Sequence, residues 1–199
     1  MTMGRNWAYN PDENNWKTPR ELLQNLVSVA SRGGNYLLNV GPTDKGNFPL
    51  ETLERLAFIG TWMARNSESI HGTTYMPLPY QTWGHATRKD ASVFLHVFNW
   101  PDEGSLVVQG FPTAAKAVST MSGTNLSYMQ EGTKLKVSIP VEAPDPDVSV
   151  PVVSVDALGP AWREFPIESE SGIEPEKYYK RMSFASGSSK PSPSINASG

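Results

Sequence analysis

The sequence predicts two kinds of structure in succession, an α/β segment over residues 1–70 and an all-β domain over residues 71–157. Two amphipathic helical patterns with a short apolar run between them indicate the first. After Ser69 the pattern changes to short runs rich in Val, Phe, Leu and Ser, separated by prolines, which is typical of antiparallel strands. With 199 residues, 38% of them hydrophobic, the chain is long enough for one or two small domains with their own cores.

The first helix is predicted over residues 18–32 from its start signals. Residues 18–21, Thr-Pro-Arg-Glu, have the spacing of a capping box with proline at the first helical position. Apolar residues then recur at helical spacing until the glycine pair at 33–34, which predicts the end of a helix of about 14 residues. The apolar run 36–40 that follows is bounded by glycines and favours a strand buried on both faces of a parallel sheet.

A second helix is predicted to begin at Pro49. Its apolar residues form one stripe, which we expect to pack against the rest of the fold. The stripe consists of Leu53, Leu56, Ala57, Gly60 and Met63, broadened by Ile59 and Trp62. Strand, loop and helix together form one repeating unit of an α/β fold.

The β domain is predicted from three strands. Residues 92–98 form the clearest run, and residues 105–108 are expected to pair with it in a hairpin across residues 101–104. Residues 135–139 alternate apolar and polar positions, as expected of a strand with one buried face. Together these strands predict a small antiparallel β-sandwich of about 80 residues.

Composition narrows the classes of function. The net charge of −3 and the pI of about 5.6 provide no basic field for phosphate backbones or anionic lipids, so we expect neither a nucleic-acid nor a membrane partner. No apolar run is long enough to cross a bilayer. The absence of cysteine excludes disulfides and thiolate metal sites. The cellular compartment stays open.

The end of the chain differs from the rest. Residues 158–182 carry aromatic side chains but no recognisable pattern, and they stay unassigned. Ser, Gly, Pro and Ala predominate over residues 183–199. This composition predicts a disordered tail, because such a segment buries too little apolar surface to fold.

Four ordered motifs resemble a known family of glycosidases. They are Trp7-Ala8-Tyr9-Asn10, the strand and turn at 33–43, Ile59-Gly60-Thr61-Trp62 and Ser69-Ile70-His71-Gly72-Thr73. Over about residues 1–155 the chain resembles the C-terminal part of the α-L-fucosidases of glycoside hydrolase family 29. The resemblance implies that residues 1–70 are the last βα unit of a (β/α)8 barrel, followed by a C-terminal β-sandwich.

The resemblance also implies an activity. A member of this family is a retaining exo-glycosidase that removes terminal α-L-fucose from glycans or glycoconjugates without cofactor or metal. It uses a nucleophilic Asp and an acid/base Glu about 5 Å apart. We expect both carboxylates to precede this chain, together with the earlier barrel strands, so no catalytic residue is assigned within it. The chain alone is expected to be inactive.

The acidic residues that are present fit other roles. Asp44 lies in the loop after the predicted strand, where a turn explains it more simply than catalysis. Glu21 is accounted for as a helix cap, and Asp12 and Glu13 are interpreted as solvated loop charges. The three histidines lie far apart in sequence without companion ligands at metal spacing, so we expect no zinc site.

Three residues are candidates for binding the sugar. The resemblance implies that Tyr36 corresponds to a family position that can line the pocket for the fucose methyl group, and an aromatic ring suits a 6-deoxy sugar. Packing inside the barrel is the alternative for Tyr36, and the pocket is favoured. Trp7 either touches the sugar or packs inside the barrel, and Ala8, in place of the usual family glycine, leaves both roles open. Asn39 is polar within an apolar run. Its amide must bind either loop backbone, which is favoured, or a polar ligand at the strand end.

Two alternatives use other features of the chain. In one, the sandwich is a non-catalytic carbohydrate-binding or interaction module with an exposed platform of Trp83, Trp100 and Phe111. Tryptophans that flank a strand more often lie in a core, which counts against it. In the other, the chain completes a barrel in trans with a separate N-terminal portion, because unpaired barrel elements leave apolar faces uncovered. The expected ligand of the complete enzyme is a fucosylated glycan.

Overall fold

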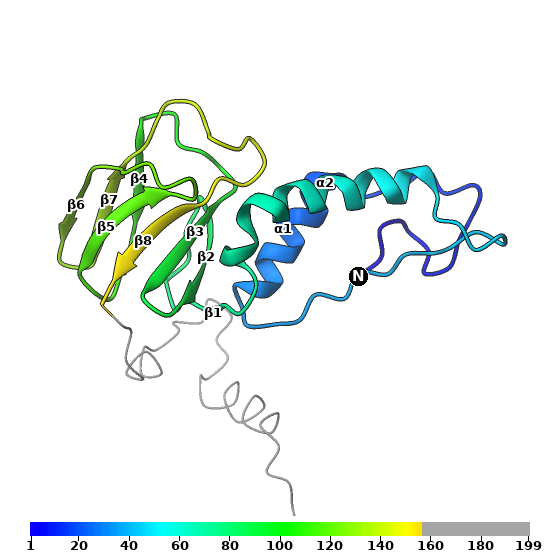
Figure 1. Ribbon diagram of the computed structural model, residues 1–199, viewed down its shortest axis with the longest axis horizontal. Coiled ribbons are helices and arrows are strands. Elements are labelled where there is room, and N and C mark those ends of the chain that lie inside the picture. Colours follow the sequence, from blue (N-terminus) through cyan, green and yellow to red (C-terminus); the bar gives the residue numbers. More distant parts are fainter. Residues whose placement is uncertain (157–199) are drawn as a thin grey trace, which may run out of the picture. The chain divides into compact units, whose positions relative to one another are not determined.

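The computed structural model describes residues 1–156, and all of them belong to one structural unit (Figure 1). The predictions for residues 158–182 and 183–199 lie outside the described residues. Within the described part, neither α-helix has the length and apolar character needed to cross a membrane. The elements are α1 (Pro19–Ala30), α2 (Leu50–Asn66), the 3-10 helix η1 (Ser67–Ser69), β1 (Thr74–Tyr75), β2 (Gly84–Lys89), β3 (Ser92–Val97), β4 (Ser105–Val108), β5 (Ala115–Thr120), β6 (Tyr128–Glu131), β7 (Lys134–Ser138) and β8 (Pro151–Val155).

Helix α1 confirms the helix predicted from its capping signals. Thr18 Oγ1 accepts the backbone N–H of Glu21 at 3.1 Å, and the Glu21 carboxylate accepts the N–H of Thr18 at 2.6 Å. These bonds satisfy N–H groups that have no partner within the first turn of a helix. The helix ends at Ala30, slightly earlier than predicted, and Gly33 follows with a φ of +72°, a conformation that favours glycine.

The strand predicted over residues 36–40 does not form as a regular strand. The segment is irregular, with one parallel bridge that joins Asn39 to Thr2. The N–H of Asn39 donates to the carbonyl of Met1 at 2.9 Å. The prediction was wrong because a buried parallel strand needs hydrogen-bonded neighbours along its length. Among residues 1–156, only residues 1–3 pair with this segment in the manner of a strand.

Helix α2 is confirmed, but it buries only part of the predicted stripe, the part with Trp62 and Met63. Trp62 is 2% exposed and packs against the sheet together with Met63 and Phe58. Apolar residues surround most of the helix, so the sequence offers two faces for burial, and the β-sandwich takes the one that contains Trp62. The residues of the predicted stripe that stay exposed in the described structure are Leu53, Leu56, Ala57 and Gly60.

The predicted antiparallel β-sandwich is confirmed, with two sheets. One sheet has five strands in the order β1-β2-β3-β8-β5, and the other has three in the order β4-β7-β6. Every pair of neighbouring strands is antiparallel. In β7 the residues alternate between exposed and buried, as the pattern at 135–139 predicts.

The hairpin predicted between residues 92–98 and 105–108 is wrong. Strand β3 pairs with β2 and β8, while β4 belongs to the other sheet and pairs with β7. The connection across residues 101–104 therefore passes from one sheet to the other, and there Gly104, with a φ of +65°, accepts the N–H of Ile139 at 3.0 Å. Turn residues between two strands indicate a change of direction but not which sheet the chain enters.

The five-stranded sheet is covered on both faces. On one face Val93, Leu95 and Val153 pack against the three-stranded sheet in the larger apolar core. On the other face Phe94 and Val152 belong to a second core, shared with α1 and α2. Because strand residues alternate between faces, β3 is buried on both sides and contributes to both cores.

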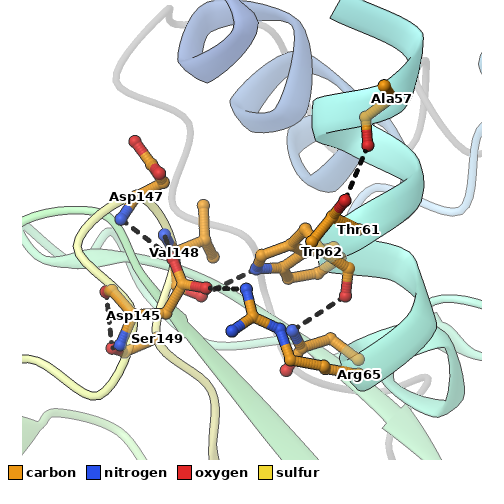
Figure 2. A network of polar contacts seen from close by, with 9 residues as sticks. Ala57, Thr61, Trp62, Arg65, Asp145, Asp147, Val148 and Ser149 are labelled. Atoms are coloured by element: carbon orange, nitrogen blue, oxygen red, sulfur yellow. Dashed lines mark hydrogen bonds and ion pairs between the residues drawn. The ribbon is translucent and has the colours of Figure 1, made fainter.

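A polar network fixes α2 on the loop before β8 (Figure 2). Trp62 donates from Nε1 to the carbonyl of Val148 at 2.9 Å, and Arg65 forms an ion pair with Asp145 at 2.9 Å. The Asp145 carboxylate also accepts the N–H groups of Asp147 and Val148 at 3.0 Å and 3.2 Å. One carboxylate thereby shapes the loop and holds the helix.

The exposed aromatic platform predicted for the sandwich does not form. Trp83 is 5% exposed and Phe111 is 0% exposed, and both belong to the larger core. Trp100 packs against this core and donates from Nε1 to the carbonyl of Pro140 at 2.9 Å. These aromatics fill the space between the sheets because burying their large apolar area is more favourable than displaying it.

Candidate functional site

Segment 37–41 lies against residues 1–9, and this junction brings together two of the three predicted site residues. Asn39 donates from Nδ2 to the carbonyl of Trp7 at 2.6 Å. Of the two partners considered for the Asn39 amide, the structure therefore shows loop backbone. Since the N–H of Asn39 also donates to Met1, its main chain and side chain tie two stretches of the chain together.

The close backbone approach continues at Gly41. A Cβ added at this position would lie 2.7 Å from the backbone N of Tyr9 and 3.0 Å from the carbonyl carbon of Ala8. Glycine lets two backbones touch where any side chain would force them apart. The contact extends the junction from Asn39 along the loop that carries Trp7.

The two aromatic candidates differ in exposure. Trp7 is 60% exposed, although its carbonyl is hydrogen-bonded. Tyr36 is half-buried, and its hydroxyl is buried without a hydrogen-bond partner among residues 1–156. Burial raises the pKa of the Tyr36 hydroxyl, which is therefore protonated at neutral pH. Within the described structure Tyr36 is a donor that lacks an acceptor.

Glu13 also belongs to this junction. The sequence indicated only a solvated loop charge at this position, so its role in the junction was missed. Its carboxylate accepts the backbone N–H groups of Arg5 at 2.8 Å, Asn6 at 3.3 Å and Asn15 at 2.9 Å. The hydrogen bond from Asn15 is the largest cause that lowers the pKa of Glu13, and those from Arg5 and Asn6 act in the same direction. Hydrogen bonds inside an irregular loop leave no periodic signal in a sequence, so no pattern was there to find.

The carboxylates of Glu13 and Glu21 do not suit catalysis. Both accept backbone N–H groups, and the pKa of each is lowered, for Glu21 chiefly by the N–H of Thr18. A general acid needs the opposite shift, because it must hold its proton near neutral pH. These two carboxylates are structural acceptors.

A cavity of about 20 Å³ lies inside the junction, and Glu13, Asn39 and Gly41 are among the residues that line it. That volume holds about one water molecule and is far too small for a sugar ring. The junction is therefore a support beneath the Trp7 loop rather than a binding pocket.

Two histidines that are distant in sequence lie together in the fold. His85 on β2 is directly opposite His96 on β3, and His96 Nε2 lies 3.0 Å from Thr87 Oγ1. Burial lowers the pKa of His96 to about 3, and the charge of His85 adds to this effect, so His96 is neutral at ordinary pH. In the described part of the chain, no three His, Cys, Asp or Glu residues gather as a metal site requires.

Comparison with known proteins gives one family from the sequence. The family described as alpha-L-fucosidase matches residues 1–68. Over 160 residues the chain is 30% identical to the α-L-fucosidase of Dictyostelium discoideum, a match that covers 77% of this chain and 33% of that protein. The chain belongs to the α-L-fucosidase family. The tissue α-L-fucosidase of Mus musculus is 31% identical over 136 residues, covering 63% of this chain and 29% of that protein.

Solved α-L-fucosidase structures share the fold of this chain. Isoenzyme 1 from Paenibacillus thiaminolyticus has a TM-score of 0.73 at 29% identity, covering 78% of this chain and 39% of that one. A family 29 α-L-fucosidase from Bacteroides thetaiotaomicron has a TM-score of 0.73 at 28% identity, covering 79% and 37%. The chain corresponds to the C-terminal part of α-L-fucosidases, and it spans 33% or less of the curated relatives named above.

Proposed function

We propose that this chain is the C-terminal part of a retaining α-L-fucosidase that hydrolyses terminal α-L-fucose from glycans or glycoconjugates. The supporting observation is the match to α-L-fucosidases over 77% of the chain in sequence and 79% in structure. The Bacteroides thetaiotaomicron relative was solved as a trapped covalent intermediate with 2-fluoro-fucosyl fluoride. A covalent glycosyl-enzyme intermediate is the mark of a retaining mechanism, in which a carboxylate is the nucleophile.

In this proposal the nucleophilic Asp and the acid/base Glu come from residues outside this chain. The carboxylates of Glu13 and Glu21 are occupied by backbone N–H groups, which supports their exclusion. A glycosidase that lacks one of its two carboxyl groups loses many orders of magnitude in rate. We therefore expect the 199-residue chain to show no fucosidase activity by itself.

Residues 1–70 are proposed to be the last βα unit of a (β/α)8 barrel. The support is the parallel bridge between Thr2 and Asn39, with α1 between the two bridged segments. Parallel neighbours connected by a helix are the repeating unit of such a barrel. Barrel enzymes bind substrate at the C-terminal ends of their strands, and Trp7 follows the first of the two segments at that end.

Trp7 and Tyr36 are the proposed sugar contacts. The exposed indole of Trp7 offers a flat apolar face to the ring and methyl group of a 6-deoxy sugar. Tyr36 precedes the second segment, at the opposite end from Trp7, so the barrel geometry does not support its contact with the sugar. What supports it is the buried hydroxyl, which has no partner among residues 1–156 and leaves one hydrogen bond for a ligand or a further protein group. Asn39 contributes to binding through its hydrogen bond to the Trp7 carbonyl.

The test is steady-state kinetics of the complete enzyme with an aryl α-L-fucoside. Trp7→Ala and Tyr36→Ala should each raise KM and lower kcat/KM by about 10- to 100-fold, since each removes an apolar contact with the sugar. Tyr36→Phe keeps the ring and loses the hydroxyl, so it distinguishes the contribution of the ring to binding from that of the hydroxyl. Unchanged kinetics in both alanine variants would remove these residues from the site. Fucosidase activity in the isolated chain would refute the proposal that both catalytic carboxylates lie outside it.

A further inference from the structure

The loop that carries Trp7 is closed by one carboxylate. Glu13 Oε2 accepts the N–H of Arg5 at 2.8 Å and that of Asn6 at 3.3 Å, and Oε1 accepts the N–H of Asn15 at 2.9 Å. Both oxygens are used, so the loop folds around a single negative charge. Hydrogen bonds to an ionised acceptor are stronger than neutral ones.

Glu13 is itself held in place by its surroundings. A Cβ added at Gly4 would lie 2.7 Å from Glu13 Oε2, so the backbone at residue 4 leaves room for the carboxylate and little else. Trp16 donates from Nε1 to the carbonyl of Glu13 at 3.1 Å. The guanidinium of Arg55 on α2 lies 5.4 Å from the centre of a Trp16 ring, a cation–π contact. Glu13 is therefore connected to a helix and not only to its own loop.

Trp7 is held from its other side by Asn39. The amide of Asn39 donates to the Trp7 carbonyl at 2.6 Å, while Glu13 holds the two preceding N–H groups, those of Arg5 and Asn6. The backbone is thus fixed before and after the residue, and the indole itself is 60% exposed. An aromatic side chain presented on a fixed backbone loses less conformational entropy when a ligand packs on it.

We propose that Glu13 is a positioning residue for sugar binding, which fixes the backbone of Trp7 and thereby the direction of its indole. The proposal rests on the proposed function, in which Trp7 contacts the sugar. Glu13 touches neither the sugar nor the reacting atoms. It acts through its hydrogen bonds to Arg5 and Asn6.

A double-mutant cycle in the complete fucosidase tests the proposal. Glu13→Gln keeps the shape of the side chain but replaces one acceptor oxygen with an NH2 group, which cannot accept an N–H. We expect KM for an aryl α-L-fucoside to rise about 10-fold with a smaller change in kcat. The double variant with Trp7→Ala should be no worse than Trp7→Ala alone, because the indole to be positioned is gone. Asp12→Asn, at the neighbouring exposed carboxylate, is the matched control and should change neither parameter.

The outcomes separate this proposal from the proposed function. If Trp7→Ala leaves KM unchanged, the assignment of Trp7 to the sugar site fails, and the role of Glu13 fails with it. If Trp7→Ala raises KM but Glu13→Gln does not, the positioning role alone is overturned. It is also overturned if the effects of the two variants multiply, since independent sites give additive free energies.

A second measurement uses the 199-residue chain without any substrate. Amide hydrogen exchange at Arg5 and Asn6 should be about 10-fold faster in Glu13→Gln than in the parent, because their N–H groups lose an ionised acceptor. Exchange at the same amides should be unchanged in Asp12→Asn. Equal exchange in Glu13→Gln and the parent would show that the loop does not depend on this carboxylate.

Discussion

The two faces of the five-stranded sheet are covered in different ways. The face toward the three-stranded sheet is apolar, with Val93, Leu95 and Val97 of β3 at most 2% exposed. The face toward α1 and α2 combines the apolar packing of Phe94 with the fully buried polar side chain of His96. Apolar packing is non-directional, whereas a buried polar group must meet its partner in a defined geometry.

The polar groups on the helix-facing side form a chain of hydrogen bonds from the sheet to η1. Thr87 Oγ1 donates to the carbonyl of Ser69 at 2.7 Å and lies 3.0 Å from His96 Nε2. Because the hydroxyl hydrogen is used on Ser69, His96 must donate from Nε2, which assigns its tautomer. The core between the sheets therefore supplies burial, while the helix-facing side also specifies where the helices lie.

The largest change in stability is expected at Trp62, where apolar burial and a hydrogen bond involve the same side chain. Trp62→Ala should lower the free energy of unfolding by about 3–5 kcal/mol, because it leaves a cavity at a buried position and removes the hydrogen bond to Val148. Urea unfolding followed by circular dichroism measures this change. Trp7→Ala, at a residue that is 60% exposed, is the matched control and should change stability by less than about 0.5 kcal/mol.

A loss for Trp62→Ala close to that for Trp7→Ala would show that the helices are held without this contact. Separate unfolding transitions for the helix and sheet signals of the parent chain would contradict a shared core between the helices and the five-stranded sheet. The two faces would then belong to independently folding units, and no single free energy of unfolding would describe the chain.

The second prediction concerns the pH dependence of stability, which arises on the helix-facing side of the five-stranded sheet. Burial lowers the pKa of His96 from an ordinary value of about 6.5 to about 3, and the charge of His85 adds to this. Between these values the unfolded chain binds more protons than the folded chain, so stability is lost as pH falls from about 6.5 toward 3. This group contributes a slope of up to about 1.4 kcal/mol per pH unit. His85, whose pKa is lowered chiefly by burial and further by Arg32, acts in the same direction.

Urea unfolding between about pH 7 and pH 5 tests this slope above the range in which carboxylates titrate. His96→Gln should flatten the pH dependence of stability, whatever its effect on stability at a single pH. An unchanged slope in His96→Gln would assign the pH dependence of stability to another group and contradict the role given to His96.

Features that depend on a few neighbouring residues were predictable from the sequence. The capping box of Thr18 and Glu21 acts within one helical turn, and the alternation in β7 follows from the geometry of a single strand. Trp7, Tyr36 and Asn39 were selected as candidate site residues because they lie in short motifs, and their contact with sugar stays a prediction. The junction between Trp7 and Asn39 joins residues that are distant in sequence, and only the structure shows it.

Features that depend on choosing among distant partners were not predictable. Strand β4 is apolar enough for either sheet, and its pairing with β7 is decided by the topology of the whole sandwich. The run 36–40 has the composition of a buried strand, but its regularity depends on neighbours that residues 1–156 do not supply. Glu13 and Asp12 are neighbouring acidic loop residues, and no sequence pattern indicates that Glu13 accepts backbone N–H groups.

The smallest change in stability is expected for substitutions on the outer face of α2, on the other side of the helix from Trp62. Apart from its chain neighbours and the backbone of its own helix, a Cβ added at Gly60 meets no atom of the described structure within 4 Å. Gly60→Ala should therefore raise the free energy of unfolding of the 199-residue chain by about 0.5–1 kcal/mol, because alanine loses less backbone entropy in a helix. Urea unfolding measures the gain. Ala57→Gly, at another exposed position of the same face, is the inverse control and should cost a similar amount.

A loss of stability in Gly60→Ala would contradict the open face and show that another surface lies against it. The same pair of variants in a complete fucosidase tests whether another part of the enzyme covers the outer face of α2. If Gly60→Ala is stabilising in the 199-residue chain but destabilising in the complete enzyme, then α2 buries Trp62 against the sandwich and Gly60 against the remainder of the enzyme. If it is stabilising in both, the outer face of α2 is exposed in the whole enzyme, and the helix depends on the face of Trp62 alone.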